Sequence, residues 1–298
     1  MSTDMQREAS TPVIDTGVAI GTSDAPTEFV ELEGRTLAYR SIGAGPEMIW
    51  CNRFRGTLDT WDPAFLDNLA RSFTVITFDY SGIGQSTGVA PSTIGEMAQD
   101  AKDLADELEI ARFVIGGWSM GGVAAQVVVA RWPESVTHAI LVGTNPAGPN
   151  ARAAEQLFYE RARKSENDLE DETVLFFEPR SAVSRAAAER THQRLARRRS
   201  DRDPAVPAVV FNKILQTVGA DIRSDTEHVR DAIMATAVPI LIISGDHDIS
   251  FPVQNWYTLS GELPTSQHIV FPSAGHGPHH QYPEVAAAYI TAFIQTTR

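Results

Sequence analysis

The residues best suited to chemistry lie in the run Gly117-Trp118-Ser119-Met120-Gly121, which has the pattern Gly-x-Ser-x-Gly. The run directly follows the apolar segment 113–115 and directly precedes a second apolar stretch of helical length. Glycines on both sides of a serine permit a sharp strand-to-helix turn with the hydroxyl at its apex. The pattern therefore predicts a nucleophilic Ser119. A glycine-rich turn with a helix-capping serine is the simpler alternative.

A serine hydroxyl becomes a good nucleophile only when a base takes its proton and a carboxylate orients that base. Such groups follow two later runs of strand length. Residues 245–248 read Gly-Asp-His-Asp, and residues 274–277 read Ala-Gly-His-Gly. The carboxyl ends of parallel strands meet at one edge of a sheet. We therefore expect a Ser, Asp, His set at that edge, with Asp246 and Asp248 both open as its acid.

The elements that must position these residues alternate between short apolar runs and longer helical patterns. The expected strands are 29–32, 36–40, 47–52, 73–78, 113–116, 139–142, 239–244 and 268–271. The expected helices outside the middle of the chain are 63–71, 92–108, 119–130, 253–260 and 283–295. The first two strands should form a hairpin, and the later alternation predicts a mostly parallel α/β sheet flanked by helices.

The chain divides into three regions by pattern. Residues 1–26 are rich in Ser, Thr, Asp and Ala, and we expect a flexible leader there. Residues 146–236 show helical stretches without strands, which predicts an α-helical cap inserted into the fold. Residues 27–145 and 237–298 should form the core. The arginines of the cap alternate with acidic residues, as on an ordinary charged helix face.

Composition narrows the possible partners. The formal net charge is −13, which disfavours binding to nucleic acid or to an anionic membrane. No apolar run approaches the roughly 18 residues of a membrane span. The single cysteine, Cys51, excludes an internal disulfide or a site of several thiolates, and it indicates the reducing cytoplasm. We expect a cytoplasmic protein that acts on a small molecule, with no metal and no organic cofactor.

Taken together, these motifs resemble the α/β-hydrolase superfamily, above all its small esterases, cofactor-free haloperoxidases and lactonases. The resemblance runs from about residue 28 to the end, and segment 146–236 looks like the family's cap. The run Asp79 to Ser86 is similar to the family's D-x-x-G-x-G-x-S turn, which implies a structural role.

The resemblance also implies the acid of the triad. Residues 245–252 match the pattern G-x-x-D-x-x-x-P, which makes Asp248 the acid and leaves Asp246 as a loop carboxylate. His276 is the expected base, because it follows a strand and has a glycine on each side. Three other histidines are rivals for that role. His247 is expected to be an exposed loop residue, and His279 and His280 are expected to cap the next helix.

An oxyanion hole in this family uses two backbone N–H groups, which correspond here to Met120 and Phe54. The chain departs from the family just before Phe54, where Asn52-Arg53 replaces the usual His-Gly pair. This loses a glycine able to adopt positive φ, although asparagine tolerates that conformation better than most residues.

Two arginines and a tryptophan are candidates for contact with substrate. Arg53 and Arg55 flank Phe54 and could recognise a carboxylate or another anion. Two solvated arginines are the alternative. Trp118, which precedes Ser119, is a further candidate contact.

The resemblance implies a serine hydrolase that cleaves an ester or lactone of a small, fairly apolar molecule through an acyl-enzyme on Ser119. A cofactor-free haloperoxidase or perhydrolase, or a carbon–carbon bond hydrolase, could use the same triad. A ligand-binding receptor on the same fold is the alternative from another functional class.

Overall fold

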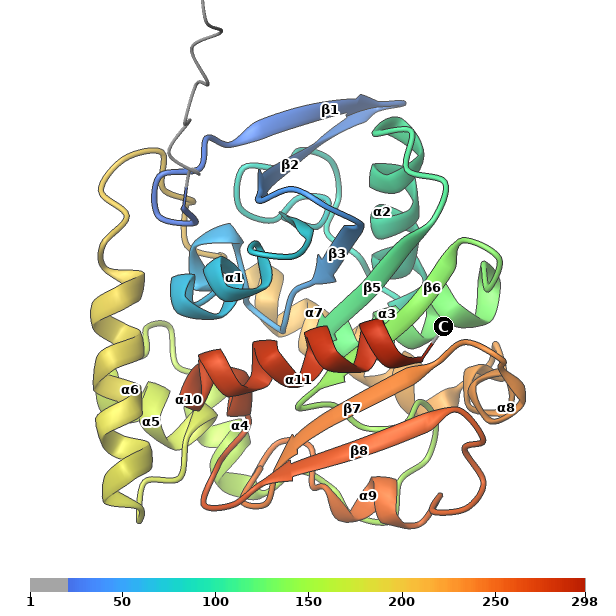
Figure 1. Cartoon of the computed structure of the whole chain (residues 1–298). Coiled ribbons are helices and arrows are strands. Elements are labelled where there is room, and N and C mark those ends of the chain that lie inside the picture. The colour runs from blue at the N-terminus through green and yellow to red at the C-terminus, as the bar shows by residue number, and fades with distance from the viewer. Residues whose placement is uncertain (1–20, 298) are drawn as a thin grey trace, which may run out of the picture.

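A computed structural model describes residues 21–297 of the chain. Within this range eight strands form one sheet in the order β1-β2-β4-β3-β5-β6-β7-β8 (Figure 1). The strands are β1 (Glu28–Leu32), β2 (Arg35–Ile42), β3 (Glu47–Cys51), β4 (Thr74–Phe78), β5 (Phe113–Trp118), β6 (Val136–Val142), β7 (Ile240–Gly245) and β8 (Ser266–Phe271). β1 and β2 form the predicted hairpin, β2 is also antiparallel to β4, and the remaining pairs are parallel. The predicted mostly parallel α/β sheet is confirmed.

Helices cover both faces of this sheet. The core helices are α1 (Pro63–Leu69), α2 (Ile94–Glu107), α3 (Met120–Arg131), α9 (Gln254–Tyr257), α10 (Pro278–Gln281) and α11 (Pro283–Thr296), with a short 3-10 turn at Leu58–Thr60. α1 and α11 pack together on one face, and α2 and α3 pack together on the other. Figure 1 shows α11 crossing in front of the sheet.

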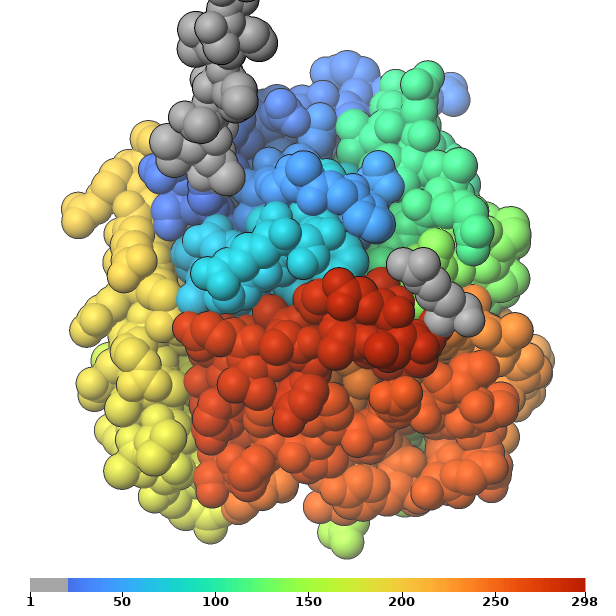
Figure 2. Space-filling view, viewed as in Figure 1, coloured from blue at the N-terminus to red at the C-terminus, as the bar shows by residue number. Residues whose placement is uncertain are grey.

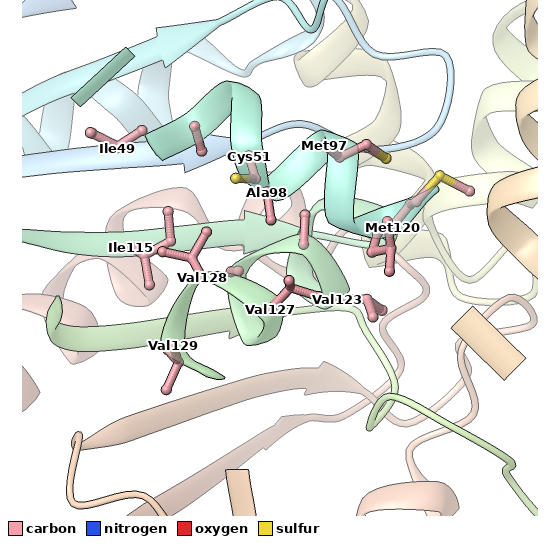
Figure 3. Packing of buried hydrophobic residues seen from close by; sticks show 14 of the residues in the cluster. Ile49, Cys51, Met97, Ala98, Ile115, Met120, Val123, Val127, Val128 and Val129 are labelled. Carbon is pink, nitrogen blue, oxygen red and sulfur yellow. The ribbon is translucent and has the colours of Figure 1, made fainter. Parts of the chain in front are cut away.

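The alternation of side chains along β3 explains why both faces need cover. Met48 and Trp50 point into the apolar cluster that contains α1 and α11. Ile49 and Cys51 point into the cluster that contains α2 and α3, as Figure 3 shows for the second face. Successive side chains of a strand point to opposite faces, so a strand that is apolar throughout requires helices on both sides.

Two helices of the core start with side-chain caps. α1 begins as expected, with Asp62 accepting a hydrogen bond from the Ala64 N–H at 2.9 Å and Pro63 in the first turn. α2 begins with a capping box, in which the Thr93 side chain accepts from the Glu96 N–H and the Glu96 carboxylate accepts from the Thr93 N–H.

The segment between β6 and β7 is helical, as expected, and no strand occurs in residues 146–236. Its helices are α4 (Gln156–Ala162), α5 (Leu169–Phe176), α6 (Ala182–Leu195), α7 (Ala208–Ser224) and α8 (Val229–Ala235). α6 packs against α5, α1 and α10, whereas α7 packs on α2 and α8 packs on α3. This insertion therefore contacts the core through α6, α7 and α8, and Figure 2 shows the yellow segment around α6 at the left edge of the molecule.

An ion pair ties α6 to the start of α1. The guanidinium of Arg194 donates to both carboxylate oxygens of Asp62, with Nε 2.7 Å from Oδ1 and Nη2 2.5 Å from Oδ2. The Asp62 side chain is fully buried. Such a bidentate contact fixes the orientation of both groups, so Asp62 has a second role beyond the helix cap that the sequence predicts.

Two local expectations differ from the structure. Residues 21–26 were expected in the flexible leader, but Thr22 donates to Asp67 at 2.8 Å from its backbone and Arg198 donates to the Ala25 carbonyl at 2.9 Å. These contacts hold that part of the chain on the core, while residues 1–20 lie outside the described range. The expected helix 253–260 is only the four residues of α9.

Candidate active site

Ser119 lies in a strained turn between β5 and α3. Its backbone has φ 62° and ψ −124°, in the positive-φ region that residues with a side chain rarely adopt. A side chain at Gly117 would come within 2.2 Å of the Gly121 carbonyl oxygen, and one at Gly121 within 2.2 Å of the Cys51 carbonyl oxygen. Both glycines are therefore required by close backbone contacts. This is the strand-to-helix turn predicted from the sequence.

The end of β7 and the end of β8 bring Asp248 and His276 together. The distance from His276 Nδ1 to Asp248 Oδ2 is 2.7 Å, and both side chains are buried. The other carboxylate oxygen of Asp248 accepts from the N–H groups of Ser250 at 2.7 Å and Phe251 at 2.8 Å. With both oxygens occupied, the carboxylate is held in a fixed orientation toward the imidazole.

The rival acid has a different partner. Asp246 Oδ1 lies 2.6 Å from Nδ1 of the neighbouring His247 and accepts from the Ala274 N–H at 3.2 Å. The side chain of His247 is exposed, as expected, and its Nδ1 bonds to Asp246. Of the two carboxylates left open by the motif, only Asp248 contacts His276.

Neither Ser119 Oγ nor His276 Nε2 has a hydrogen-bond partner in residues 21–297. Both residues line one cavity of about 870 Å³. The hydroxyl and the free ring nitrogen therefore open into the same space. A proton can pass between them if a substrate draws them into hydrogen-bond range, which ligand-free enzymes often leave loose.

The two expected oxyanion donors lie in the segments that carry the cavity wall and the nucleophile. Phe54 lines the cavity, and Met120 is the first residue of α3. Neither backbone N–H donates to an acceptor within the described part of the chain. Free N–H groups at a helix start beside the nucleophile are the donors that a developing oxyanion needs.

Asn52 shapes the turn that carries Phe54. Its side chain accepts from the Arg53 N–H at 2.8 Å and donates to the Thr57 carbonyl at 2.8 Å. The positive φ in this turn occurs at Arg55, with φ 58°, and at neither Asn52 nor Arg53. Position 53 therefore does not need a glycine here, because the positive φ of this turn falls on Arg55 instead.

The two arginines of this turn have different surroundings. The Arg55 guanidinium donates to the carbonyls of Ala162, Lys164 and Ser165, with distances between 2.7 and 3.0 Å, and its carbon lies 3.9 Å from the centre of the Phe211 ring. Arg55 therefore ties the oxyanion turn to the end of α4. The guanidinium of Arg53 makes a single hydrogen bond, from Nη1 to the Phe54 carbonyl at 2.8 Å.

Trp118 is buried and does not line the cavity. Its indole N–H donates to the His276 carbonyl at 2.8 Å, and its ring packs edge-on against Phe176 with centres 5.4 Å apart. The structure therefore does not place Trp118 where a substrate in this cavity would contact it. The side chain instead holds the backbone of His276 through its indole N–H.

Two aromatic residues that the sequence did not single out cover His276. The Phe251 ring stacks on the imidazole with centres 5.3 Å apart, and Phe176 stacks at 6.3 Å. Phe251 lies inside the acid motif, so its proximity could have been anticipated. Phe176 comes from the end of α5, about 100 residues before His276, and no local pattern connects the two.

The cavity lies between the core and the insertion. Its walls combine apolar side chains with charged ones from both the core and the insertion. The charged and titratable residues among them are Arg53, Arg55, Asp59, Glu166, Glu172, His192, Arg202, Asp203 and His276. A volume of this size accommodates a small organic molecule.

His279 and His280 are buried in α10, although the sequence suggested helix caps. The ring of His279 packs 4.6 Å from Trp118 and 4.9 Å from Phe65, centre to centre, and neither ring nitrogen has a partner among the described residues. Burial lowers the pKa of His279 well below its usual value and that of His280 to about 4. Both are therefore neutral in the folded protein at pH 7.

This burial predicts a loss of stability in acid. The unfolded chain protonates each histidine below a pKa of about 6.5, while the folded chain does not, so stability falls as the pH drops below that value. His279→Phe removes one such group from an aromatic site. Between pH 7 and 5 the variant should lose about 2 kcal/mol less unfolding free energy than the wild type. Urea denaturation at the two pH values measures this, and equal losses would contradict the neutral, buried His279.

Other candidate chemistries have little support in residues 21–297. No group of three or more His, Cys, Asp or Glu side chains there is arranged to hold a metal ion. Cys51 is fully buried, and burial raises the pKa of its thiol to about 12, so it is no nucleophile at neutral pH. None of the helices in this range is both long and apolar enough to span a bilayer.

Comparison with known proteins decides the family. A family model described as the alpha/beta hydrolase fold matches residues 48–283. The chain belongs to the α/β-hydrolase fold family. A solved α/β-hydrolase fold protein from Chitinophaga pinensis is 28% identical, covers 93% of this hydrolase and 100% of its own chain, and has a TM-score of 0.83.

Relatives of this hydrolase differ in reaction. A Mycobacterium tuberculosis protein provisionally named non-heme bromoperoxidase BpoC is 28% identical, over 88% of this chain and 98% of its own. The pimeloyl-[acyl-carrier protein] methyl ester esterase of Nitrosomonas europaea is 26% identical, over 84% of this chain and 96% of its own. The family thus supports a hydrolase, while the reaction must be argued from the site.

Proposed function

We propose that this α/β hydrolase is a serine hydrolase that cleaves a carboxylic ester or lactone of a small, fairly apolar molecule. The observation that carries the proposal is the 2.7 Å contact between His276 and Asp248 beside a cavity that Ser119 also lines. The similarity to a methyl ester esterase agrees with it. The single cysteine agrees with the cytoplasm as the proposed location.

The reaction follows from the available groups. His276 Nε2 takes the proton of Ser119 as the hydroxyl oxygen attacks the substrate carbonyl carbon. The N–H groups of Met120 and Phe54 stabilise the oxyanion, and Asp248 stabilises the imidazolium. The imidazolium then gives its proton to the leaving alkoxide, which departs as alcohol. A water molecule, activated by the same nitrogen, attacks the acyl-enzyme and releases the acid and a free Ser119.

A second reaction on the same residues is favoured by one relative. In that candidate reaction, to which the similarity to BpoC points, peroxide replaces water in the second step and gives a peracid that oxidises halide. Carbon–carbon bond hydrolysis could proceed on the same triad. A receptor that retains the triad without turnover is the remaining candidate from another class.

Turnover assays separate these candidates. We expect hydrolysis of short p-nitrophenyl esters, with an initial burst of nitrophenol if acyl-enzyme breakdown is slow. Peroxide-dependent bromination that exceeds hydrolysis would favour the haloperoxidase. Absence of turnover with every ester and lactone tried, together with saturable binding of one of them, would favour the receptor.

A further inference from the structure

The catalytic cavity contains a cation without a counter-charge, namely the guanidinium of Arg53. None of the ion pairs in residues 21–297 includes this side chain, and its buried Nε has no hydrogen-bond partner there. The single bond from Nη1 goes to the neighbouring Phe54 carbonyl. A guanidinium has five N–H donors, so most of its capacity is unused.

Two aromatic rings hold this guanidinium beside the catalytic residues. Its carbon lies 4.6 Å from the centre of the Phe176 ring and 5.2 Å from that of Trp118. The same two rings lie 6.3 and 6.0 Å from the imidazole of His276. Aromatic faces stabilise a guanidinium and fix its plane, but they leave its N–H edge free.

The acidic side chains of the cavity do not neutralise Arg53. Among them, Glu172 has the strongest favourable electrostatic effect on Arg53. Its carboxylate, however, lies 3.0 Å from Nδ1 of His192 and forms no ion pair with Arg53 among the described residues. Burial lowers the pKa of Arg53 to about 10, so the group remains charged at pH 7. A half-buried charge without a partner is costly, and an anionic ligand would offset that cost.

Resting on the proposed hydrolase function, we propose that Arg53 binds a carboxylate of the substrate, so that the preferred substrate is an ester that carries a free carboxylate away from the scissile bond. The fork of N–H donors fits the two oxygens of a carboxylate. Arg55, whose donors are committed to the carbonyls of the insertion, takes no part.

Matched esters test this on the full-length protein. On the acyl side, the monomethyl esters of succinate, adipate and suberate are compared with the methyl esters of the corresponding fatty acids. On the alcohol side, 6-acetoxyhexanoate is compared with hexyl acetate. Release of acid is followed by titration at constant pH, and the measured quantity is the ratio of kcat/KM for the charged ester to that for its neutral partner.

The wild type should prefer the charged ester in the acyl-side comparison, the alcohol-side comparison or both. The comparison that shows the preference identifies the part of the substrate that carries the carboxylate. Arg53→Met should reduce that preference by about 10- to 100-fold, mainly through a higher KM for the charged ester. Arg53→Lys should restore only part, because an ammonium cannot make two parallel bonds. The neutral ester corrects for any shift of the Phe54 N–H.

Arg185→Met is the matched control. Arg185 lies on α6, pairs with Glu170 at 3.1 Å on the surface and does not line the cavity. Its removal should leave the ratio unchanged. A ratio unaffected by Arg53→Met, or equally affected by both variants, would overturn the inference while hydrolysis of neutral esters stands. Loss of turnover with every ester in the wild type would instead overturn the proposed hydrolase function.

Discussion

Replacing Ser119 by alanine is expected to lower kcat for ester hydrolysis by a factor on the order of 10⁴ or more. In the proposed mechanism the hydroxyl forms the covalent intermediate, and His276 and Asp248 cannot act without it. The fold should persist, because Ser119 holds the turn through its backbone, whose N–H donates to the Val142 carbonyl at 2.9 Å. The thermal unfolding midpoint of the variant measures this.

A fluorophosphonate probe makes the assignment site-specific. It should label the wild type at Ser119 and leave Ser119→Ala unlabelled, as read by mass spectrometry of the peptide. Ser165→Ala is a matched control, because Ser165 lines the same cavity but contributes only its carbonyl to a contact, with Arg55. The control should keep its activity within a few-fold. Labelling of another serine, with activity retained in Ser119→Ala, would refute the nucleophile.

The core of this site is predictable because close packing leaves few residue types possible there. Gly117 and Gly121 are glycines because any side chain would meet a carbonyl oxygen at about 2 Å. The strands are apolar on both faces because helices cover both. Both constraints act on residues that are close in the sequence, so they produce a recognisable sequence motif.

The substrate side of the cavity is not predictable in this way. Arg53 and Arg55 are two residues apart and identical in type, yet only Arg55 donates to carbonyls about 110 residues later. The contact of Phe176 with His276 likewise joins the insertion to the last loop. A helical pattern shows which face of a helix is apolar but not which distant residues that face will meet.

The buried histidines show a second limit of prediction from the sequence. In the sequence, His279 and His280 follow Pro278 and look like polar residues at a helix start. In the fold, the ring of His279 packs among Trp61, Phe65 and Trp118. The aromatic residues that surround it come from two separate segments, the start of α1 and the end of β5, so the apolar character of the site exists only after those segments assemble.

The choice of acid gives the second large prediction. Asp248→Asn should lower kcat by about 10⁴-fold with little change in fold. The amide oxygen of asparagine can still accept from the N–H groups of Ser250 and Phe251, which now bond to Oδ1 of Asp248. Its NH₂ group would then face His276 Nδ1. A donor in that position forces the proton of the neutral imidazole onto Nε2, which can no longer accept the proton of Ser119.

Asp246→Asn is the matched control, since it makes the same chemical change two residues away. Asp246 bonds to His247 and to the Ala274 N–H, so the substitution should cost about 1 kcal/mol of stability and leave kcat within a few-fold. Steady-state kinetics at several pH values and urea denaturation of both variants measure the two effects. Because the tautomer argument requires a carboxylate at Nδ1 itself, loss of turnover in Asp246→Asn with activity kept in Asp248→Asn would show that the 2.7 Å contact is not the one that orients the base.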